Sequence, residues 1–340
     1  MKTWLLRIVA LLVLVVVSIV GYVVWRAQRT THPVGFEQAV AQDARGRRFP
    51  LAIWYPTRAT PRPTTLIGLT LMSVAPDAPV EGERLPLIVI SHGNLGGPAS
   101  HADLAMALAD AGYVVVAPMH TGDNFRDGSG TGVPGFWSGR NRQLQAALDY
   151  MTAQWNGRAH LDPARIGAYG FSAGGFTVLT AVGARPDLAR VATHCAQHQE
   201  FACDVLRSAH SALVAGKLEP IDRDFHVDPR IRAAVVAAPG LGFTFEGGGL
   251  EDVRVPLQLW TGGRDVYVPE ETNTALVRDA LGSRVESHVE AGAVHMSFLA
   301  PCVLFGPPIL CSDVGDFDRA AFHRRMNADV VRFFDAQLRK

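Results

Sequence analysis

Short apolar runs, separated by segments with helical patterning, constrain the fold of this chain more than any other feature. Each run is uninterrupted by charge, which is typical of a parallel strand that is buried on both faces of its sheet. The runs are Leu87–Ile90, Tyr113–Ala117, Ile166–Tyr169, Ala233–Ala238 and Leu257–Trp260, and Val285–Val289 is expected to be the last strand. Helices are expected over Ala102–Ala111, Gln143–Ala153, Phe176–Ala184 and Ala320–Leu338. This alternation predicts an α/β fold with a mostly parallel central sheet flanked by helices.

Three segments depart from the alternation. Phe36–Val40 and Phe49–Tyr55 flank a polar turn at residues 43–47 and are expected to form a β-hairpin. Residues 58–86 are rich in Pro and Thr and are expected to be a loop, with one strand near Leu66–Met72. Residues 185–230 show helical patterning and no strand pattern. We interpret them as a helical, cap-like insertion after the expected helix Phe176–Ala184, within one domain that spans residues 30–340.

Composition limits the kind of function. The chain has 340 residues, of which 48% are hydrophobic and 19% charged, enough apolar content for a sizeable core. Lys and Arg number 32 and Asp and Glu number 32, so the net charge is zero. A chain without an overall basic field is not expected to bind nucleic acid.

The N-terminus carries an apolar segment with basic flanks. Ile8–Trp25 contains one polar side chain, Ser18, which is near the lower length limit for a membrane-spanning helix. No small-residue cleavage site follows, and Tyr22 and Trp25 suit a membrane interface. We therefore interpret residues 1–29 as an uncleaved signal anchor in a bacterial inner membrane, with the domain in the periplasm. A cleaved signal peptide with secretion, and a buried helix, are the alternatives.

Four cysteines fall into two local pairs, Cys195 with Cys203 and Cys302 with Cys311. Their spacing favours two local disulfides, which would require an oxidising compartment. A zinc site of His194, Cys195, His198 and Cys203 is an alternative, but its spacing matches no common zinc pattern, and neither a metal nor a cofactor is expected. Buried free thiols are the third alternative.

The strongest chemical signal is Gly170-Phe171-Ser172-Ala173-Gly174, which lies between a predicted strand and a predicted helix. Small residues two positions before and after the Ser allow the tight turn that exposes a nucleophilic hydroxyl. Ser172 is therefore the candidate nucleophile.

A serine nucleophile requires a base, which is normally a His oriented by a carboxylate. Three His follow the insertion. His288 lies within the predicted last strand and His323 within the final helix, whereas His295 lies in a loop just past a strand. A loop at a strand end suits a base, so His295 is the candidate.

Asp265 is the candidate acid because it ends a glycine turn that follows the strand Leu257–Trp260. It precedes His295 by 30 residues, which leaves room for one helix and one strand. Glu270 and Glu271 begin the next helix, where acidic residues suit the helix dipole. Asp252 lies at the wrong end of the strand.

Two backbone N–H groups are needed to hold the oxyanion. Ala173 follows the nucleophile and supplies one of them. Asn94, in the glycine-rich loop after Leu87–Ile90, is the candidate for the other, with Leu95 as the alternative. His92, His101 and His120 are interpreted as structural residues.

These residues together resemble the α/β-hydrolase family, and more narrowly its bacterial predicted dienelactone hydrolases, which are related to platelet-activating-factor acetylhydrolases. The resemblance covers about residues 36–338 and includes a tail in which the Cys302–Cys311 loop leads into Phe317–Ala320. It is carried by Trp54–Pro56, Ser91–Gly93, Ala117–Asn124, Gly170–Gly175 and His295 with Phe298–Cys302. In two respects the chain departs from these relatives. Ser172 stands where dienelactone hydrolases have Cys, and Ala237–Gly240 lacks the acid that the acetylhydrolases carry there.

We therefore expect a serine hydrolase that cleaves carboxylic esters of short-chain or lipid acyl groups through Ser172, His295 and Asp265. The partners expected are a small-molecule or lipid ester as substrate and the membrane through the N-terminal segment. A thioesterase or acyltransferase would use the same residues. A catalytically idle binding protein on the same fold is the alternative from a different class.

Overall fold

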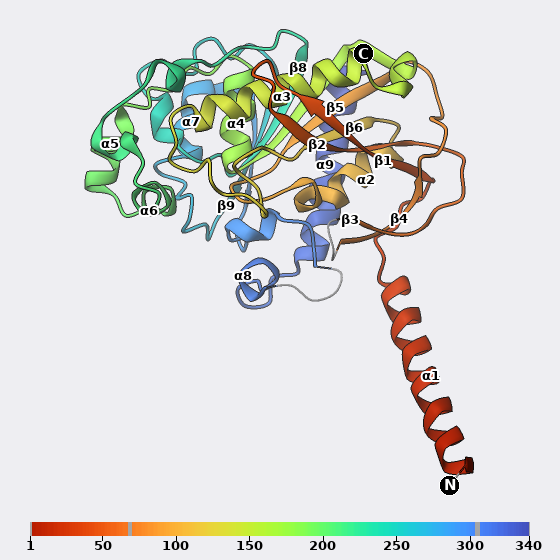
Figure 1. Cartoon of the computed structure of the whole chain (residues 1–340). Coiled ribbons are helices and arrows are strands. Elements are labelled where there is room, and N and C mark those ends of the chain that lie inside the picture. Colours follow the sequence, from red (N-terminus) through yellow and green to blue (C-terminus); the bar gives the residue numbers. More distant parts are fainter. Residues whose placement is uncertain (1, 67–69, 303–306, 340) are drawn as a thin grey trace.

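The computed structural model describes residues 2–66, 70–302 and 307–339 of the chain (Figure 1). In this part of the chain, ten strands form one sheet in the order β10-β9-β8-β7-β5-β6-β2-β1-β4-β3. The strands are β1 (Val34–Gln42), β2 (Arg48–Pro56), β3 (Arg62–Leu66), β4 (Thr70–Pro76), β5 (Leu85–Ser91), β6 (Val114–Pro118), β7 (Leu161–Phe171), β8 (Ile231–Ala237), β9 (Leu257–Gly262) and β10 (Val285–Glu290). From β6 to β10 all neighbours are parallel, so the expected α/β sheet is confirmed.

The order of the strands reverses at β5, which lies between β6 and β7. On either side of such a point the connections leave the sheet in opposite directions. This leaves a crevice at the carboxyl ends of the strands, where ligands of α/β proteins bind.

The first half of the sheet differs in part from the sequence-based expectation. Strands β1 and β2 form the expected antiparallel hairpin, from Val34↔Pro56 to Gln42↔Arg48. Where one strand was expected near Leu66–Met72, the structure has two antiparallel strands, β3 and β4. Residues 67–69 of that prediction lie outside the described residues. Pro63 is compatible with β3 because β3 is an edge strand, and an edge strand has backbone positions that do not donate a hydrogen bond to a neighbouring strand.

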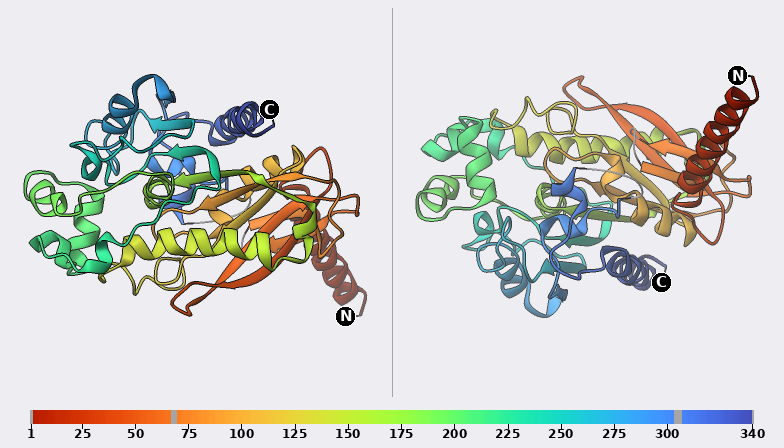
Figure 2. Two further views of the ribbon diagram at one scale, coloured as in Figure 1. Left: turned by 90° about the horizontal axis from the view of Figure 1, so that it is seen from above. Right: turned by 90° about the horizontal axis from the view of Figure 1, so that it is seen from below.

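Helices cover both faces of the sheet (Figure 2). One face carries α2 (Ala102–Asp110) and α9 (Arg319–Leu338), and the other carries α3 (Phe136–Ala153), α4 (Ala173–Ala181) and α7 (Thr274–Leu281). Neighbouring strand residues therefore enter different cores: Val116 packs on the α3 side and Val115 on the α2 side. Burial on both faces explains why these strands read as continuous apolar runs.

Helix α3 begins at Phe136, seven residues before the expected start at Gln143. Its first two turns contain Ser138, Arg140 and Asn141, which are polar but buried. A pattern search for apolar residues cannot recognise a helix face that is buried through polar contacts.

The insertion at residues 185–230 is helical, as expected, with α5 (Arg190–Gln197) and α6 (Phe201–Ser208). A disulfide joins Cys195 to Cys203, with 5.3 Å between Cα atoms. A second joins Cys302 to Cys311, the last residue of α8 (Pro308–Cys311), with 5.7 Å between Cα atoms. Both local pairings are confirmed, and the alternatives that used free thiols or thiolate ligands to zinc are wrong.

Helix α1 (Lys2–Trp25) projects from the side of the domain that carries β3 and β4 (Figure 1). Within residues 2–66, 70–302 and 307–339, no helix combines the length and the apolar character that crossing a membrane requires.

Replacing Cys302 and Cys311 together by Ser is expected to lower the free energy of unfolding by about 2–3 kcal/mol, because the bridge restricts the unfolded chain. Urea unfolding in the absence of reductant measures the loss. The double Ser variant of Cys195 and Cys203 is the matched comparison, because that bridge joins residues 8 positions apart and the Cys302–Cys311 bridge joins residues 9 positions apart. Unchanged stability in both variants would contradict closed bridges in the folded protein.

Candidate active site

Four loops at the carboxyl ends of parallel strands converge on one site. Gly93–Leu95 follows β5, Ser172 follows β7, Asp265 follows β9 and His295 follows β10. Residues that are far apart in the sequence meet here because the strands that carry them are parallel neighbours and end at the same edge.

Ser172 occupies a sharp turn between β7 and α4, with φ 55° and ψ −120°. The turn is compatible only with glycine two positions before and two positions after Ser172. A Cβ at Gly174 would lie 1.9 Å from the carbonyl oxygen of Ser91, and a Cβ at Gly170 would lie 2.1 Å from that of Gly174. The packing of the turn against β5 thus holds Ser172 in a conformation that is rare for a residue with a side chain.

The structure brings Ser172, His295 and Asp265 together. His295 Nε2 lies 2.9 Å from Ser172 Oγ, and His295 Nδ1 lies 2.6 Å from Asp265 Oδ2. The other carboxylate oxygen of Asp265 accepts hydrogen bonds from the N–H groups of Tyr267 and Val268. With Nδ1–H donating to Asp265, Nε2 is left as the acceptor that faces the Ser172 hydroxyl.

The alternative acids are placed elsewhere. Asp252 forms an exposed ion pair with Arg185, and Glu270 pairs with Arg278. The segment Ala237–Gly240, at the end of β8, contributes a backbone contact instead, because the Ser172 N–H donates to the carbonyl of Ala237.

Two backbone N–H groups next to Ser172 have no acceptor among the described residues, those of Asn94 and Ala173. The alternative donor, the Leu95 N–H, already donates to Asp123 Oδ1 at 2.7 Å. The Asn94 side chain donates to the same oxygen, also at 2.7 Å. The loop is therefore held by Asp123 in a form that leaves the Asn94 N–H free.

Asp123 and Arg140 form a fully buried ion pair beneath this loop, which sequence reasoning did not identify. Arg140 also donates to the carbonyl of His92 and, at 3.1 Å, to Thr177 Oγ1 on α4. Burial and the neighbouring guanidinium lower the pKa of His92 to about 3. Neutral His92 accepts a hydrogen bond from the backbone N–H of His120 through Nε2. His92 therefore has a structural role.

A second buried network supports the short 3₁₀ turn His295–Phe298. His323, on α9, places Nδ1 2.6 Å from Asp103 Oδ2 and Nε2 2.8 Å from the carbonyl oxygen of Ser297. Both partners can only accept, so both ring nitrogens must donate and His323 is an imidazolium. Burial opposes this charge, but the Asp103 carboxylate and the two hydrogen bonds outweigh it and raise the pKa of His323.

The remaining histidines near the sheet also make structural contacts. His120 lies 2.9 Å from Ser91 Oγ, and His101 packs its ring on Tyr169 and Phe171. His288, on β10, stacks on Trp260 and lies 2.8 Å from Glu286.

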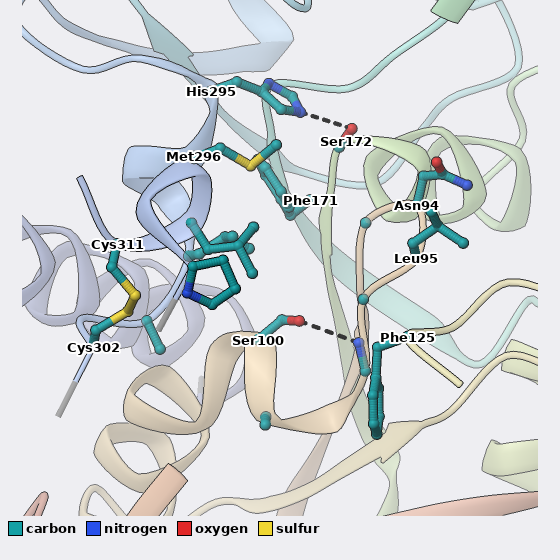
Figure 3. A pocket seen from close by; sticks show the side chains of 18 of the residues that line it. Asn94, Leu95, Ser100, Phe125, Phe171, Ser172, His295, Met296, Cys302 and Cys311 are labelled. Atoms are coloured by element: carbon teal, nitrogen blue, oxygen red, sulfur yellow. Dashed lines mark hydrogen bonds between the residues drawn. A yellow bond between two sulfur atoms is a disulfide. The ribbon is translucent and has the colours of Figure 1, made fainter. Parts of the chain in front are cut away.

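Two apolar cavities border Ser172. The larger, of about 300 Å³, is bounded by His295 and Met296 on one side and by Leu95 and Phe125 on the other (Figure 3). The Cys302–Cys311 bridge closes its far end (Figure 3). The smaller, of about 40 Å³, lies under the insertion and is lined mainly by Ala173, Trp137, Phe201, Val205, Leu206 and Tyr267.

The comparisons with known proteins agree with this architecture. Residues 72–213 match the sequence profile of the dienelactone hydrolase family. In structure the chain is similar to a ferulic acid esterase from Streptomyces cinnamoneus, with a TM-score of 0.60 and 19% sequence identity over 92% of each chain. No curated protein matches the chain in sequence.

The fold is that of the α/β hydrolases. Over residues 72–213, which are less than half of its length, the chain is similar to the dienelactone hydrolase family.

The stability contributed by His323 should depend on pH. Because its folded-state pKa is raised, the contribution is complete below the ordinary pKa of about 6.5 and is lost as the pH rises through the higher folded value. We expect the difference in unfolding free energy between the native protein and His323→Gln to be largest near pH 6 and to shrink toward pH 9. Other charges that face His323 are those of Asp103 and Arg319.

Chemical unfolding at a series of pH values measures this difference. His226→Gln, at an exposed position, controls for the loss of an imidazole. A difference for His323→Gln that does not change with pH would contradict a buried imidazolium.

Proposed function

We propose that the protein hydrolyses carboxylic esters through an acyl-enzyme on Ser172. His295 Nε2 takes the Ser172 proton as Oγ attacks the ester carbonyl, and Asp265 stabilises the imidazolium that forms. The N–H groups of Asn94 and Ala173 hold the oxyanion of the tetrahedral intermediate. His295 then gives the proton to the alcohol oxygen as the C–O bond breaks.

The second half of the reaction reverses these roles. A water molecule loses a proton to His295 Nε2 and attacks the acyl carbonyl. The tetrahedral intermediate collapses, the proton returns to Ser172 Oγ, and the carboxylic acid leaves. Apart from the ester and the water molecule, every step uses groups of this chain, and each proton is returned within one cycle.

The observation that carries the proposal is the hydrogen-bonded row from Asp265 through His295 to Ser172, with distances of 2.6 and 2.9 Å, beside two N–H groups that have no acceptor in the described part of the chain. A Gly-rich β–α turn without chemistry would need neither a strained Ser172 nor two nearby backbone amides without acceptors. An idle binding protein on this fold would have no reason to retain the whole arrangement.

The two cavities support a division of the ester between them. The leaving alcohol must lie on the side of His295 Nε2, which protonates its oxygen, and His295 lines only the larger cavity. The acyl group then extends the other way, past Ala173 into the smaller cavity. At about 10–15 Å³ per water-sized group, the smaller cavity holds about three such groups and the larger on the order of twenty.

We therefore propose esters with a short acyl group and a bulky apolar alcohol as the substrate class. The insertion forms the acyl side, through Phe201, Val205 and Leu206, and Cys302, Leu310 and Cys311 border the alcohol side. The two disulfides support an oxidising compartment for the domain. The periplasmic location and the N-terminal anchor stay predictions from the sequence.

Ser172→Ala is expected to lower kcat on the order of 10⁴-fold or more and to abolish labelling by a fluorophosphonate probe, because it removes the hydroxyl that forms the acyl-enzyme. Circular dichroism checks that the fold is intact. Ser208→Ala, on the surface of α6, is the control and should keep both activities. Labelling of the Ser172→Ala protein would assign the nucleophile to another residue.

Octyl acetate and ethyl octanoate are isomers that reverse the sizes of the acyl and alcohol groups. The cavity volumes predict that kcat/KM for octyl acetate exceeds that for ethyl octanoate by about tenfold or more, as hydrophobic pockets discriminate by about that factor per poorly fitted group. Acid release in a pH-stat measures both substrates.

Two variants test the assignment of the cavities. Val205→Ala widens the smaller cavity and should raise the rate with ethyl octanoate, whereas Leu310→Ala in the larger cavity should act mainly on octyl acetate. A preference for ethyl octanoate in the native protein would reverse the assignment.

A further inference from the structure

Three side chains between α5 and α6 place metal-binding atoms close together, outside the catalytic residues. They are His194, His198 and Glu200, and one donor atom from each lies within 4.8 Å of the others. His194 lies in the last turn of α5, and His198 is the extended residue that follows the helix, with its ring stacked on that of His194. Glu200 reaches them from the N-terminal end of α6.

The zinc alternative raised by the sequence had relied on Cys195 and Cys203. The disulfide removes both sulfur atoms, but it also closes the α5–α6 connection over an eight-residue separation. That closure brings Glu200 back to His194, with Glu200 Oε1 at 2.9 Å from His194 Nε2. The pattern is therefore His-x₃-His-x-Glu, a donor set of two imidazoles and one carboxylate.

Two of the three groups are already fixed in place. His194 and Glu200 are 9% and 5% exposed, and the His194 ring stacks on Phe243 with 3.5 Å between centroids. Glu200 accepts from Thr272 Oγ1 at 2.6 Å and from Asn273 Nδ2 at 3.4 Å. Such outer hydrogen bonds are what orient a carboxylate that ligates a metal.

The third group is free to complete the site. His198 is exposed and stacks on His194, with 4.3 Å between centroids and 15° between ring planes. Parallel rings do not direct two lone pairs at one point, so binding requires the His198 ring to tilt toward His194 Nε2. Its exposure allows this tilt and leaves a position for water.

We propose that His194, His198 and Glu200 bind one Zn²⁺ ion, with water as the fourth ligand. Imidazole and carboxylate donors in fourfold coordination suit Zn²⁺, at about 2.0–2.2 Å from each ligand atom.

The ion would fasten the insertion to the segment that follows Asp265. Glu200 already contacts Thr272 and Asn273 of that segment, and the next residue, Phe201, stacks on Tyr267 with 4.9 Å between centroids. Phe201 lines both cavities at Ser172. The site is thus structural, and it stabilises the wall of the smaller cavity without touching the reacting atoms.

Isothermal titration of ZnCl₂ into the full chain, after removal of metals with a chelator, tests the site. We expect one ion per chain with a dissociation constant in the micromolar range or tighter, and a rise in Tm with added Zn²⁺. His198→Ala removes the exposed ligand without disturbing the buried contacts, and it should weaken binding tenfold or more. His210→Ala removes another exposed His of the insertion and should bind as the native protein does.

Replacement of Zn²⁺ by Co²⁺ supplies an independent signature. Four-coordinate Co²⁺ gives intense visible bands, which should appear with the native protein and with His210→Ala but not with His198→Ala. No binding, or binding that is equal in the native protein and His198→Ala, would overturn the proposal and leave His194 and Glu200 as a hydrogen-bonded pair only.

Discussion

The buried contact between Arg140 and Asp123 connects the parts of the structure on which the site depends. Arg140 extends from α3 and reaches the end of β5 through the His92 carbonyl and α4 through Thr177. Asp123, after β6, takes the Leu95 N–H and so shapes the loop that presents the Asn94 N–H. A buried charge without its partner is strongly destabilising, so neither residue can be lost alone. The oxyanion loop and the nucleophile helix are thereby held by one ion pair.

The nucleophile and its base depend on different supports. Ser172 is fixed by backbone packing, because Gly174 lies directly against the carbonyl of Ser91. His295 lies in a short turn whose position depends on side chains: Asp265 on one ring nitrogen, and the His323–Asp103 pair behind Ser297. A change of pH in the neutral to alkaline range should therefore reach the turn that carries His295 before it reaches the turn that carries Ser172.

The segments outside the α/β alternation are those that shape the cavities. The Cys302–Cys311 bridge borders the larger cavity, and the insertion with its Cys195–Cys203 bridge borders the smaller one. The insertion joins one of the two main cores through Val191, Cys195, Cys203 and Leu206, so its bridge links two segments that are already packed. The proposed Zn²⁺ site would act on the insertion in the same sense, by joining it to the segment after Asp265.

Local patterns in the sequence were sufficient to predict the strands from Leu85 onward, the helices within residues 185–230, the disulfide pairing and the loops that bring Ser172, Asp265 and His295 together. Each of these depends on nearby residues: an apolar run, a glycine turn, a short Cys spacing or a loop after a strand. The early start of α3, the β3–β4 pair and the roles of Asp123, Arg140, Asp103 and His323 were not predictable in this way. Their contacts join elements far apart in the chain, as His323 and Asp103 do across 220 residues. A buried polar side chain looks like a surface residue in the sequence, and only tertiary packing supplies the partner that satisfies it.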